Sequence, residues 1–397
     1  MKKSFHFLWV SQLFANLGDV FYIVGLISIL YQFNESTFTL ALLPVLNMSG
    51  RMMSSSVAPF FLNRWRLKRI LLVSQFLKTI LLACLLFSVM TTTNLVIVCS
   101  MIFIIALLDG VALPSSEAML PRLVTKARLI RANSFLSMLN ESTRLGGWAL
   151  GGLIVAMTNG SWIIMLTLAL YVLSTLAIFC IKDATEFIRK ETVLEKSELM
   201  EGFQIIWYNR SFRSLQILSF LSTFANVVWV AAFIYIFVDE VLQVSEAWWG
   251  YINTSFFVGL LVGASVCMKL EQYFQMNFRK WLLLSSIIIA VVMLGFSINT
   301  WPFMALVLSA AFGFVTQLQG ILMASWIQVR ADEQMLAKIY SAQEVLNGVA
   351  FVVATLLVGY VADFMAIQFV FIGAAILLGI TACYFLYERK NFTKTLH

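Results

Sequence analysis

The sequence predicts an all-α integral membrane protein with twelve transmembrane helices in two pseudo-symmetric six-helix bundles. Three observations support this prediction: long apolar segments, basic residues confined to alternate loops, and an internal repeat. Of the 397 residues, 61% are hydrophobic and only 12% are charged. Soluble domains average roughly 45–50% apolar and 25% charged residues. Most of the surface of this chain must therefore contact lipid, and the lipid bilayer is its first expected partner.

The apolar segments are long enough to cross a bilayer. A spanning helix needs about 20 mostly apolar residues, and because lipid offers no hydrogen-bond partners, such a segment must be helical. The first segment is too long for a signal peptide and lacks a cleavage site, so we expect it to remain as span 1. The twelve spans cover approximately residues 5–31, 38–62, 70–90, 95–120, 132–157, 160–181, 212–238, 247–268, 280–298, 301–326, 337–362 and 367–387.

Lysine and arginine occur in alternate loops. The loops after the odd-numbered spans contain neither residue, whereas every loop after an even-numbered span and both termini contain one or more. Basic loops stay in the cytoplasm. We therefore expect a multi-pass protein of the cell membrane with both termini cytoplasmic. The net charge of +7 comes largely from these clusters, so it indicates topology rather than nucleic-acid binding.

A repeat divides the chain into two halves. A shift of 207 positions lays Met119–Gly152 over Trp326–Gly359, and it aligns Asn140 with Asn347 and Arg131 with Lys338. Repeats of this kind are typical of transporters. The long charged connection between spans 6 and 7 separates the halves. We predict an N-terminal bundle over residues 1–181, a cytoplasmic linker over 182–211 and a C-terminal bundle over 212–397.

No enzyme active site or metal site is expected. Histidine occurs only as His6 and His397, and the five cysteines lie in apolar segments without a CxxC pair. Cysteines of this kind are typically packing residues. We therefore predict no catalytic residue, no cofactor and no metal.

Several segments resemble the major facilitator superfamily, in particular its drug:proton antiporter branch typified by macrolide-efflux proteins. The sequence LPSSEAMLPRLV at Leu113–Val124, followed by Arg128–Asn133, is similar to that branch's span 4 to span 5 signature. The sequence GWALGG at Gly147–Gly152 is similar to its glycine motif. The resemblance implies that spans 1, 4, 7 and 10 line a central cavity that opens alternately to each side of the membrane.

The loop between spans 2 and 3 departs from the family pattern. In the family this loop carries a Gly, an Asp–Arg pair and a basic run that is thought to latch the cytoplasmic gate. Here Pro59 replaces the Gly and Asn63 replaces the Asp, while Arg64, Lys68 and Arg69 remain. We keep these four polar residues as the predicted gating loop and expect a weaker latch, since the carboxylate is missing.

Charged residues inside the spans are candidates for function, because an ionised side chain at the bilayer centre costs about 2.5–3.5 kcal/mol on insertion scales. We predict that Asp19 and Asp109 couple proton movement to transport; the alternative is permanent pairing of each with Arg51 or Arg144. Lys78 is expected to extend its ammonium group to the membrane surface. A charge-switch role is predicted for Arg51, Arg144, Glu141 and Glu344, although Glu141 and Arg144 are three residues apart and can simply neutralise each other.

Two further groups complete the predicted site. Polar and aromatic residues in the cavity-lining spans are candidates for substrate contact: Asn16, Phe21, Asn226, Trp229, Gln317 and Gln319. Small residues four apart allow close helix packing, and we expect this at Gly147 and Gly151 of span 5 and at Gly259 and Gly263 of span 8. The resemblance places spans 5 and 8 at the seam between the bundles, where these glycines could form a sliding contact.

The predicted function is secondary active export of a hydrophobic or amphipathic small molecule, drug- or macrolide-like, by proton antiport and alternating access. The expected partners are the substrate and protons, and we expect a monomer. No GxxxxGK[ST] nucleotide loop occurs in the chain, so ATP does not drive transport directly. The alternatives within the same fold are a siderophore exporter and a lysolipid flippase. A membrane-embedded enzyme or sensor is the alternative class, and no motif supports it.

Overall fold

The computed structural model describes residues 3–32, 37–91, 95–158, 160–182, 196–229, 231–245, 247–362 and 364–389. Within these ranges the chain forms helices and short connections, and no strand. All twelve predicted spans are found as helices, which confirms the predicted fold class.

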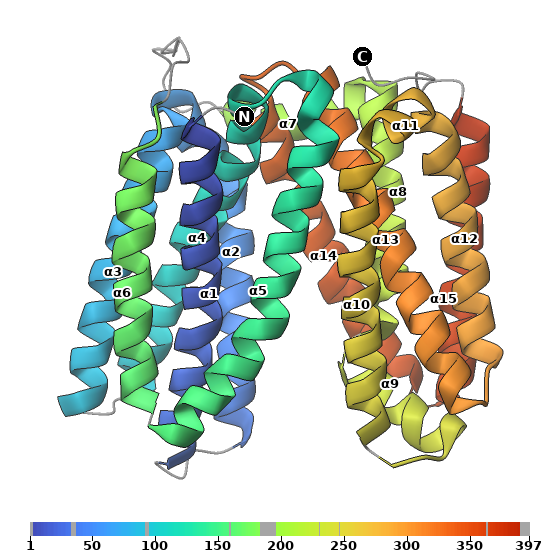
Figure 1. The fold of residues 1–397 in the computed structure, drawn as a ribbon, viewed down its shortest axis with the longest axis horizontal. Helices are drawn as coiled ribbons and strands as arrows, with labels where there is room; N and C mark the ends of the chain where they lie inside the picture. The colour runs from blue at the N-terminus through green and yellow to red at the C-terminus, as the bar shows by residue number, and fades with distance from the viewer. Residues whose placement is uncertain are drawn as a thin grey trace. The chain divides into compact units, whose positions relative to one another are not determined.

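The first six spans are single helices. They are α1 (Lys3–Gln32), α2 (Thr37–Arg64), α3 (Leu67–Thr91), α4 (Leu95–Leu123), α5 (Leu129–Met157) and α6 (Gly160–Phe179). A short 3₁₀ turn, Lys126–Arg128, precedes α5. Figure 1 shows α1, α3, α4 and α6 running side by side, in agreement with their contacts.

The remaining spans follow a linker helix, α7 (Lys196–Tyr208). Span 7 is broken into α8 (Arg210–Asn226), a 3₁₀ turn (Val227–Trp229), α9 (Ala231–Phe237) and a π-helical turn (Val238–Leu242), with a bend of 55°. Spans 8 to 12 are α10 (Ala247–Lys269), α12 (Phe278–Ile298), α13 (Pro302–Arg330), α14 (Leu336–Ala362) and α15 (Ile367–Glu388), with the short α11 (Glu271–Met276) after α10.

Length and hydropathy support a membrane location. Among the described residues, nine helices are long and apolar enough to cross a bilayer, and the bent segment from α8 onward is a tenth candidate. The other two predicted spans correspond to α2 and α5, which carry charged side chains such as Arg51 and Glu141. Charges in a spanning helix usually mark functional positions.

The helices group into two compact units. The first unit contains residues 1–125, 139–203 and 331–345, and the second contains 126–138, 204–330 and 346–397. Two segments, 126–138 and 331–345, belong to the unit formed mainly by the other end of the chain. The shift of 207 positions carries 126–138 onto 333–345, so the exchanged segments are equivalent in the two repeats.

Each unit has its own apolar core. In the first unit, Tyr22, Leu82, Ile102 and other buried residues pack together between α1, α3, α4 and α6. The core of the second unit contains a group of aromatic rings, in which Phe237, Phe296 and Phe371 lie at ring centroid distances of 4.7–5.8 Å. Aromatic pairs at such distances stabilise a core beyond their burial alone.

Candidate functional site

A charged cluster lies between α1, α3 and α4 in the first unit. Lys78 Nζ of α3 donates hydrogen bonds to Asp19 Oδ1 of α1 at 2.8 Å and to Asp109 Oδ1 of α4 at 2.7 Å. One ammonium group therefore bridges the two acids that the sequence singled out. Charge-assisted hydrogen bonds of this length are strong.

Lys78 does not reach the membrane surface, so the expectation that it extends there is wrong. Its side chain is only 2% exposed, whereas those of Asp19 and Asp109 are 32% and 18% exposed. The alternative interpretation named Arg51 or Arg144 as the partner of each acid, whereas the structure pairs both acids with Lys78. The physical reason is that an interior lysine costs less with two carboxylates beside it than an unpaired charge would.

The sequence contains a signal for the burial of Lys78, which lies in the pattern of apolar residues around it and not in its own charge. The polar residues of α3 lie on the same face as its buried leucines, at helical spacing. The buried face consists of Leu71, Ser74, Gln75, Lys78, Leu82 and Leu85. A lysine in the middle of such a face points into the bundle.

Two tyrosines complete the surroundings of the cluster. Tyr171 of α6 donates its hydroxyl hydrogen to Asp19 Oδ1, and the Lys78 ammonium lies 4.8 Å from the centroid of the same ring. Tyr22 of α1 accepts a hydrogen bond from Asn47 Nδ2 at 3.0 Å. Both tyrosines are at most 1% exposed, so buried aromatic rings cover part of the cluster.

Gly18 allows Tyr171 to reach Asp19. A Cβ atom at Gly18 would lie 2.7 Å from Cε1 of Tyr171, closer than real Cβ atoms approach their neighbours. Any larger residue would therefore displace the ring that binds the neighbouring carboxylate.

The cluster contains one more carboxylate than Lys78 can neutralise, and both carboxylates are partly accessible. Such a site can take up one further positive charge, either a proton or a cationic group. Neither acid is fully enclosed by the neighbouring helices.

A second charged group lies elsewhere in the first unit. Arg51 of α2 forms an ion pair with Glu344 of α14 at 3.4 Å, and each side chain is about one third exposed. The Nε atom of Arg51 is buried and has no hydrogen-bond partner within the described residues. The predicted charge-switch residues Arg51 and Glu344 are thus brought together.

Glu117 of α4 belongs to this group and was missed as a functional candidate. It interacts electrostatically with both Glu344 and Arg51. In the sequence, Glu117 is part of the segment LPSSEAMLPRLV at Leu113–Val124. The available signal was its position, since it is an acid inside a membrane-spanning helix and two turns beyond Asp109.

Glu141 and Arg144 of α5 form the local pair expected from their spacing, with Oε2 and Nη1 3.6 Å apart. The Arg144 side chain is 61% exposed and that of Glu141 is 16% exposed. The local interpretation is confirmed. A switch role for these two residues stays a prediction.

The substrate-contact candidates in the first unit differ in accessibility. Asn16 is partly accessible and donates a hydrogen bond to Asn140 Oδ1 at 2.8 Å. Phe21 is only 3% exposed and packs against Ile163 and Leu170. This burial argues against direct substrate contact by Phe21, because neighbouring helices already cover its ring.

The candidates in the second unit divide in the same way. Trp229 stacks on Phe312 at 4.7 Å and on Phe256 at 5.5 Å. Gln319 is buried and donates to Ser286 Oγ at 2.7 Å, so it holds α13 to α12. Gln317 remains partly accessible. Asn226 is also partly accessible, although its Oδ1 atom is buried without a hydrogen-bond partner in the described part of the chain.

The basic residues of the predicted gating loop contact aromatic rings and a backbone carbonyl group of the first unit. Arg64 lies over the ring of Phe60 at 3.9 Å, and Arg69 lies over Trp65 at 5.0 Å. Lys68 donates to the carbonyl of Phe179 at the end of α6 at 2.8 Å. This contact caps a helix C-terminus, where a cation is favourable. The side chain of Asn63 lies outside the described residues.

The predicted packing glycines lie at close contacts within their own units. A Cβ atom at Gly147 would meet Val20 of α1 at 3.1 Å, and one at Gly151 would meet Phe21 and Val24 at 3.4 Å. Gly259 and Gly263 of α10 face the backbone of α13 at Ala310 and Phe314. The sliding role proposed for these glycines stays a prediction.

Comparison with known proteins identifies relatives along nearly the whole chain. The family profile described as Major Facilitator Superfamily matches residues 8–347. The uncharacterized MFS-type transporter YfmI of Bacillus subtilis (strain 168) is 27% identical over 390 residues, covering 97% of this chain and 96% of that one. The MFS-type transporter YjbB of the same organism is 26% identical over 384 residues, covering 94% and 93%.

Solved structures share the fold. A bacterial homologue of the iron transporter ferroportin, in an outward-facing state, is similar with a TM-score of 0.77 at 13% identity, covering 97% of this chain and 100% of that one. The transporter FucP in its outward conformation has a TM-score of 0.77 at 15% identity, covering 96% and 98%. Members of this family are transporters and not enzymes. The family match over most of the length, together with the shared fold, shows that this chain belongs to the major facilitator superfamily.

Proposed function

We propose that this transporter exports a hydrophobic or amphipathic small molecule, drug- or macrolide-like, in exchange for protons. The observation that carries the proposal is the cluster of Asp19, Lys78 and Asp109, where two partly accessible carboxylates share one buried ammonium group. One ammonium group can neutralise only one of the two carboxylates. Burial favours the neutral, protonated form of the other, so that carboxylate can bind and release a proton.

The cluster suggests how proton and cargo exchange. In the outward-open conformation, a proton binds whichever of the two carboxylates Lys78 neutralises less well. In the inward-open conformation, this proton leaves to the cytoplasm. Alternating access then couples each release to movement of the cargo. Since acids outnumber bases in this cluster, a neutral or cationic cargo fits it better than an anion.

The location follows from the loop charges. The basic loops after the even-numbered spans favour a protein of the cell membrane with cytoplasmic termini. In the proposed exchange, the cargo leaves the cell as protons enter. A single chain contains both repeats of the transport fold, which supports a monomer as the working unit.

The test is substrate-evoked proton movement in proteoliposomes, measured with a pH-sensitive dye and a panel of macrolides and cationic dyes as cargo. Asp19→Asn and Asp109→Asn should each abolish the proton signal, because each removes one exchangeable carboxylate. Asp239→Asn is the matched control, since Asp239 is exposed and lies outside the cluster. Proton signals equal to wild type in both cluster variants would refute the coupling role.

A further inference from the structure

Glu117 is an acid of a membrane-spanning helix that has no hydrogen-bond or ion-pair partner within the described residues. It lies in α4, which ends at Leu123, and its side chain is exposed. An ionisable side chain inside a spanning helix is costly and usually marks a functional position. No role has been assigned to Glu117 so far.

The charges that act on Glu117 come from α2 and α14. Arg51 of α2 attracts its carboxylate, and Glu344 of α14 repels it. Arg51 is itself bound to Glu344 at 3.4 Å. We call these three residues the Glu117 group, and all of them belong to the first unit. When all three are ionised, the group has one more negative charge than positive charge, and the guanidinium group is already engaged by Glu344.

The Glu117 group differs from the cluster around Lys78 in its hydrogen bonds. Asp19 accepts hydrogen bonds from Lys78 and Tyr171, and Asp109 accepts one from Lys78. Glu117 accepts none in the described part of the chain, so its oxygen atoms are free to bind a ligand. Asp109 and Glu117 are eight residues apart on α4, which is about 12 Å along a helix. The two carboxylates therefore form separate sites.

An accessible carboxylate of this kind selects its ligand by charge. An organic cation gains a charge-assisted interaction with Glu117. An anion is repelled by the net negative charge of the group, and an uncharged molecule gains much less from it. A proton needs no open surface, whereas a bulky cation must contact the carboxylate directly. Both side chains that face Glu117 are about one third exposed, which leaves room for such contact.

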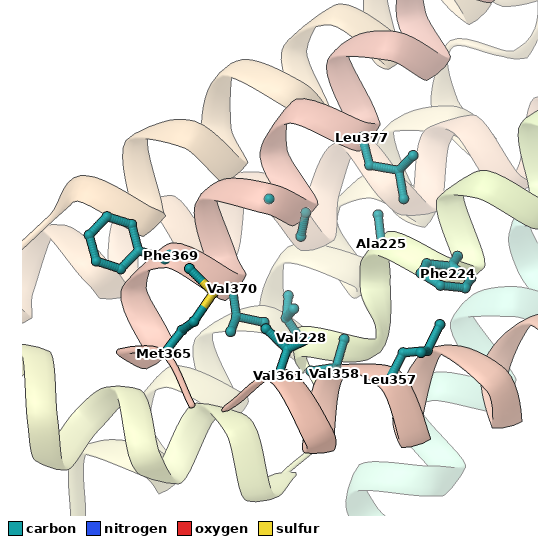
Figure 2. A pocket seen from close by; sticks show the side chains of 12 residues that line it. Phe224, Ala225, Val228, Leu357, Val358, Val361, Met365, Phe369, Val370 and Leu377 are labelled. Carbon is teal, nitrogen blue, oxygen red and sulfur yellow. The ribbon is translucent and has the colours of Figure 1, made fainter. Parts of the chain in front are cut away.

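The apolar pocket of the second unit cannot recognise a cation. This pocket lies between α8, α14 and α15, and Figure 2 shows the side chains that line it. They include Val228, Leu357 and Phe369, and none of the lining residues is ionisable. A charged group placed there would lose its hydration without gaining a partner.

We propose that Glu117, assisted by Glu344, binds the cationic group of the cargo, so that the transporter selects amphipathic organic cations. The proposal rests on the export function proposed above and narrows its cargo from neutral or cationic molecules to cationic ones. Glu344 contributes a second negative charge, and it also holds Arg51 so that this guanidinium group does not occupy Glu117.

The experiment compares two probes of similar shape and different charge. Methyltriphenylphosphonium is a cation, and triphenylphosphine oxide carries the same three phenyl groups without a net charge. Binding of each probe to the purified transporter in detergent is measured by equilibrium dialysis, with protein-free micelles as the background. The wild type should bind the cation at least roughly tenfold more tightly, because interactions with a charged group are the stronger ones.

Variants of the Glu117 group should remove this preference. Glu117→Gln keeps the shape of the side chain without its charge, so it should weaken binding of the phosphonium about tenfold and leave binding of the phosphine oxide unchanged. Glu117→Asp keeps the charge and should keep the preference. Glu344→Gln frees Arg51 to pair with Glu117, so it should also weaken binding of the cation. Glu240→Gln is the matched control, since Glu240 is exposed and belongs to the second unit.

Three results would overturn the proposal. The first is a wild type that binds both probes equally or binds neither. The second is an unchanged preference for the cation in both Glu117→Gln and Glu344→Gln. The third is an equal loss of both probes in these variants, because a purely structural role of Glu117 would affect the two probes alike.

The cation site and the proton coupling can fail separately, since the binding assay needs no proton gradient. A preference that depends on Glu117, together with wild-type proton signals in Asp19→Asn and Asp109→Asn, would support the cation site and refute the coupling. Loss of the proton signal in those two variants, with an unchanged preference in Glu117→Gln, would support the coupling and overturn the cation site.

Discussion

At the scale of single residues, the decisive position is Lys78. A lysine that is 1% exposed in a membrane-spanning helix is stable only because Asp19 and Asp109 bind its ammonium group. Removing one partner of a buried charge pair costs about 3–5 kcal/mol, because the other charge is left uncompensated. The two acids and the lysine therefore act as one unit, and a change in any of them alters the others.

Lys78→Met should lower the stability of the transporter, since two carboxylates are then left without their cation. The double variant Lys78→Met/Asp109→Asn should recover part of the loss, because it removes one of the uncompensated charges. Thermal unfolding in detergent measures both. Lys280→Met, at an exposed position, is the control and should unfold like wild type. A double variant no more stable than Lys78→Met would contradict the shared-charge arrangement.

At the scale of helices, glycines determine how closely two elements approach. On α10, Gly259 faces the backbone of Ala310, and Gly263 faces that of Phe314. On α13, Gly313 in turn faces the backbone of Phe256. Backbone atoms cannot move aside as a side chain can, so α10 and α13 pack closely only with glycine at these positions.

Gly259→Leu should lower the free energy of unfolding of the second unit by about 1–3 kcal/mol or more, as is typical of overpacking. The reason is that the new side chain separates α10 from α13. Gly250→Leu on the same helix is the matched control, since no atom lies within 4 Å of its Cβ position. The midpoint of thermal unfolding reports the difference. Equal midpoints for the two variants would show that the close contact is not required.

At the scale of the whole molecule, the repeat and the loop charges make a joint prediction about orientation. The repeat relates two six-span halves in the same orientation, so corresponding loops should lie on one side of the membrane. The exchanged segments 126–138 and 331–345 are themselves related by this repeat. Both contain basic residues of the predicted cytoplasmic loops.

The orientation can be tested by cysteine labelling of intact cells, in a background without the five native cysteines. A cysteine at Lys182, after span 6, should react only with a reagent that crosses the membrane. A cysteine at Thr300, which is exposed between α12 and α13, should also react with an impermeant reagent. The reverse pattern, or the same pattern at both positions, would overturn the predicted topology.

The sequence by itself determined the architecture of this protein. The apolar length of a span is a local property, because each span must satisfy its backbone hydrogen bonds within itself. The placement of lysine and arginine is local too, since it is read from each loop separately. They therefore predicted all twelve helices, and the cost of burying charge pointed to Asp19, Asp109, Arg51 and Glu344 as special.

The tertiary structure alone decided the partners of these charges. Which side chains the buried face of α3 meets depends on how α3 packs against α4 and α6, and that packing made Lys78 the partner of both acids. Packing also buried Phe21 and Gln319. Such contacts join residues far apart in the chain, so no local pattern specifies them, and they follow from how the helices fill space together.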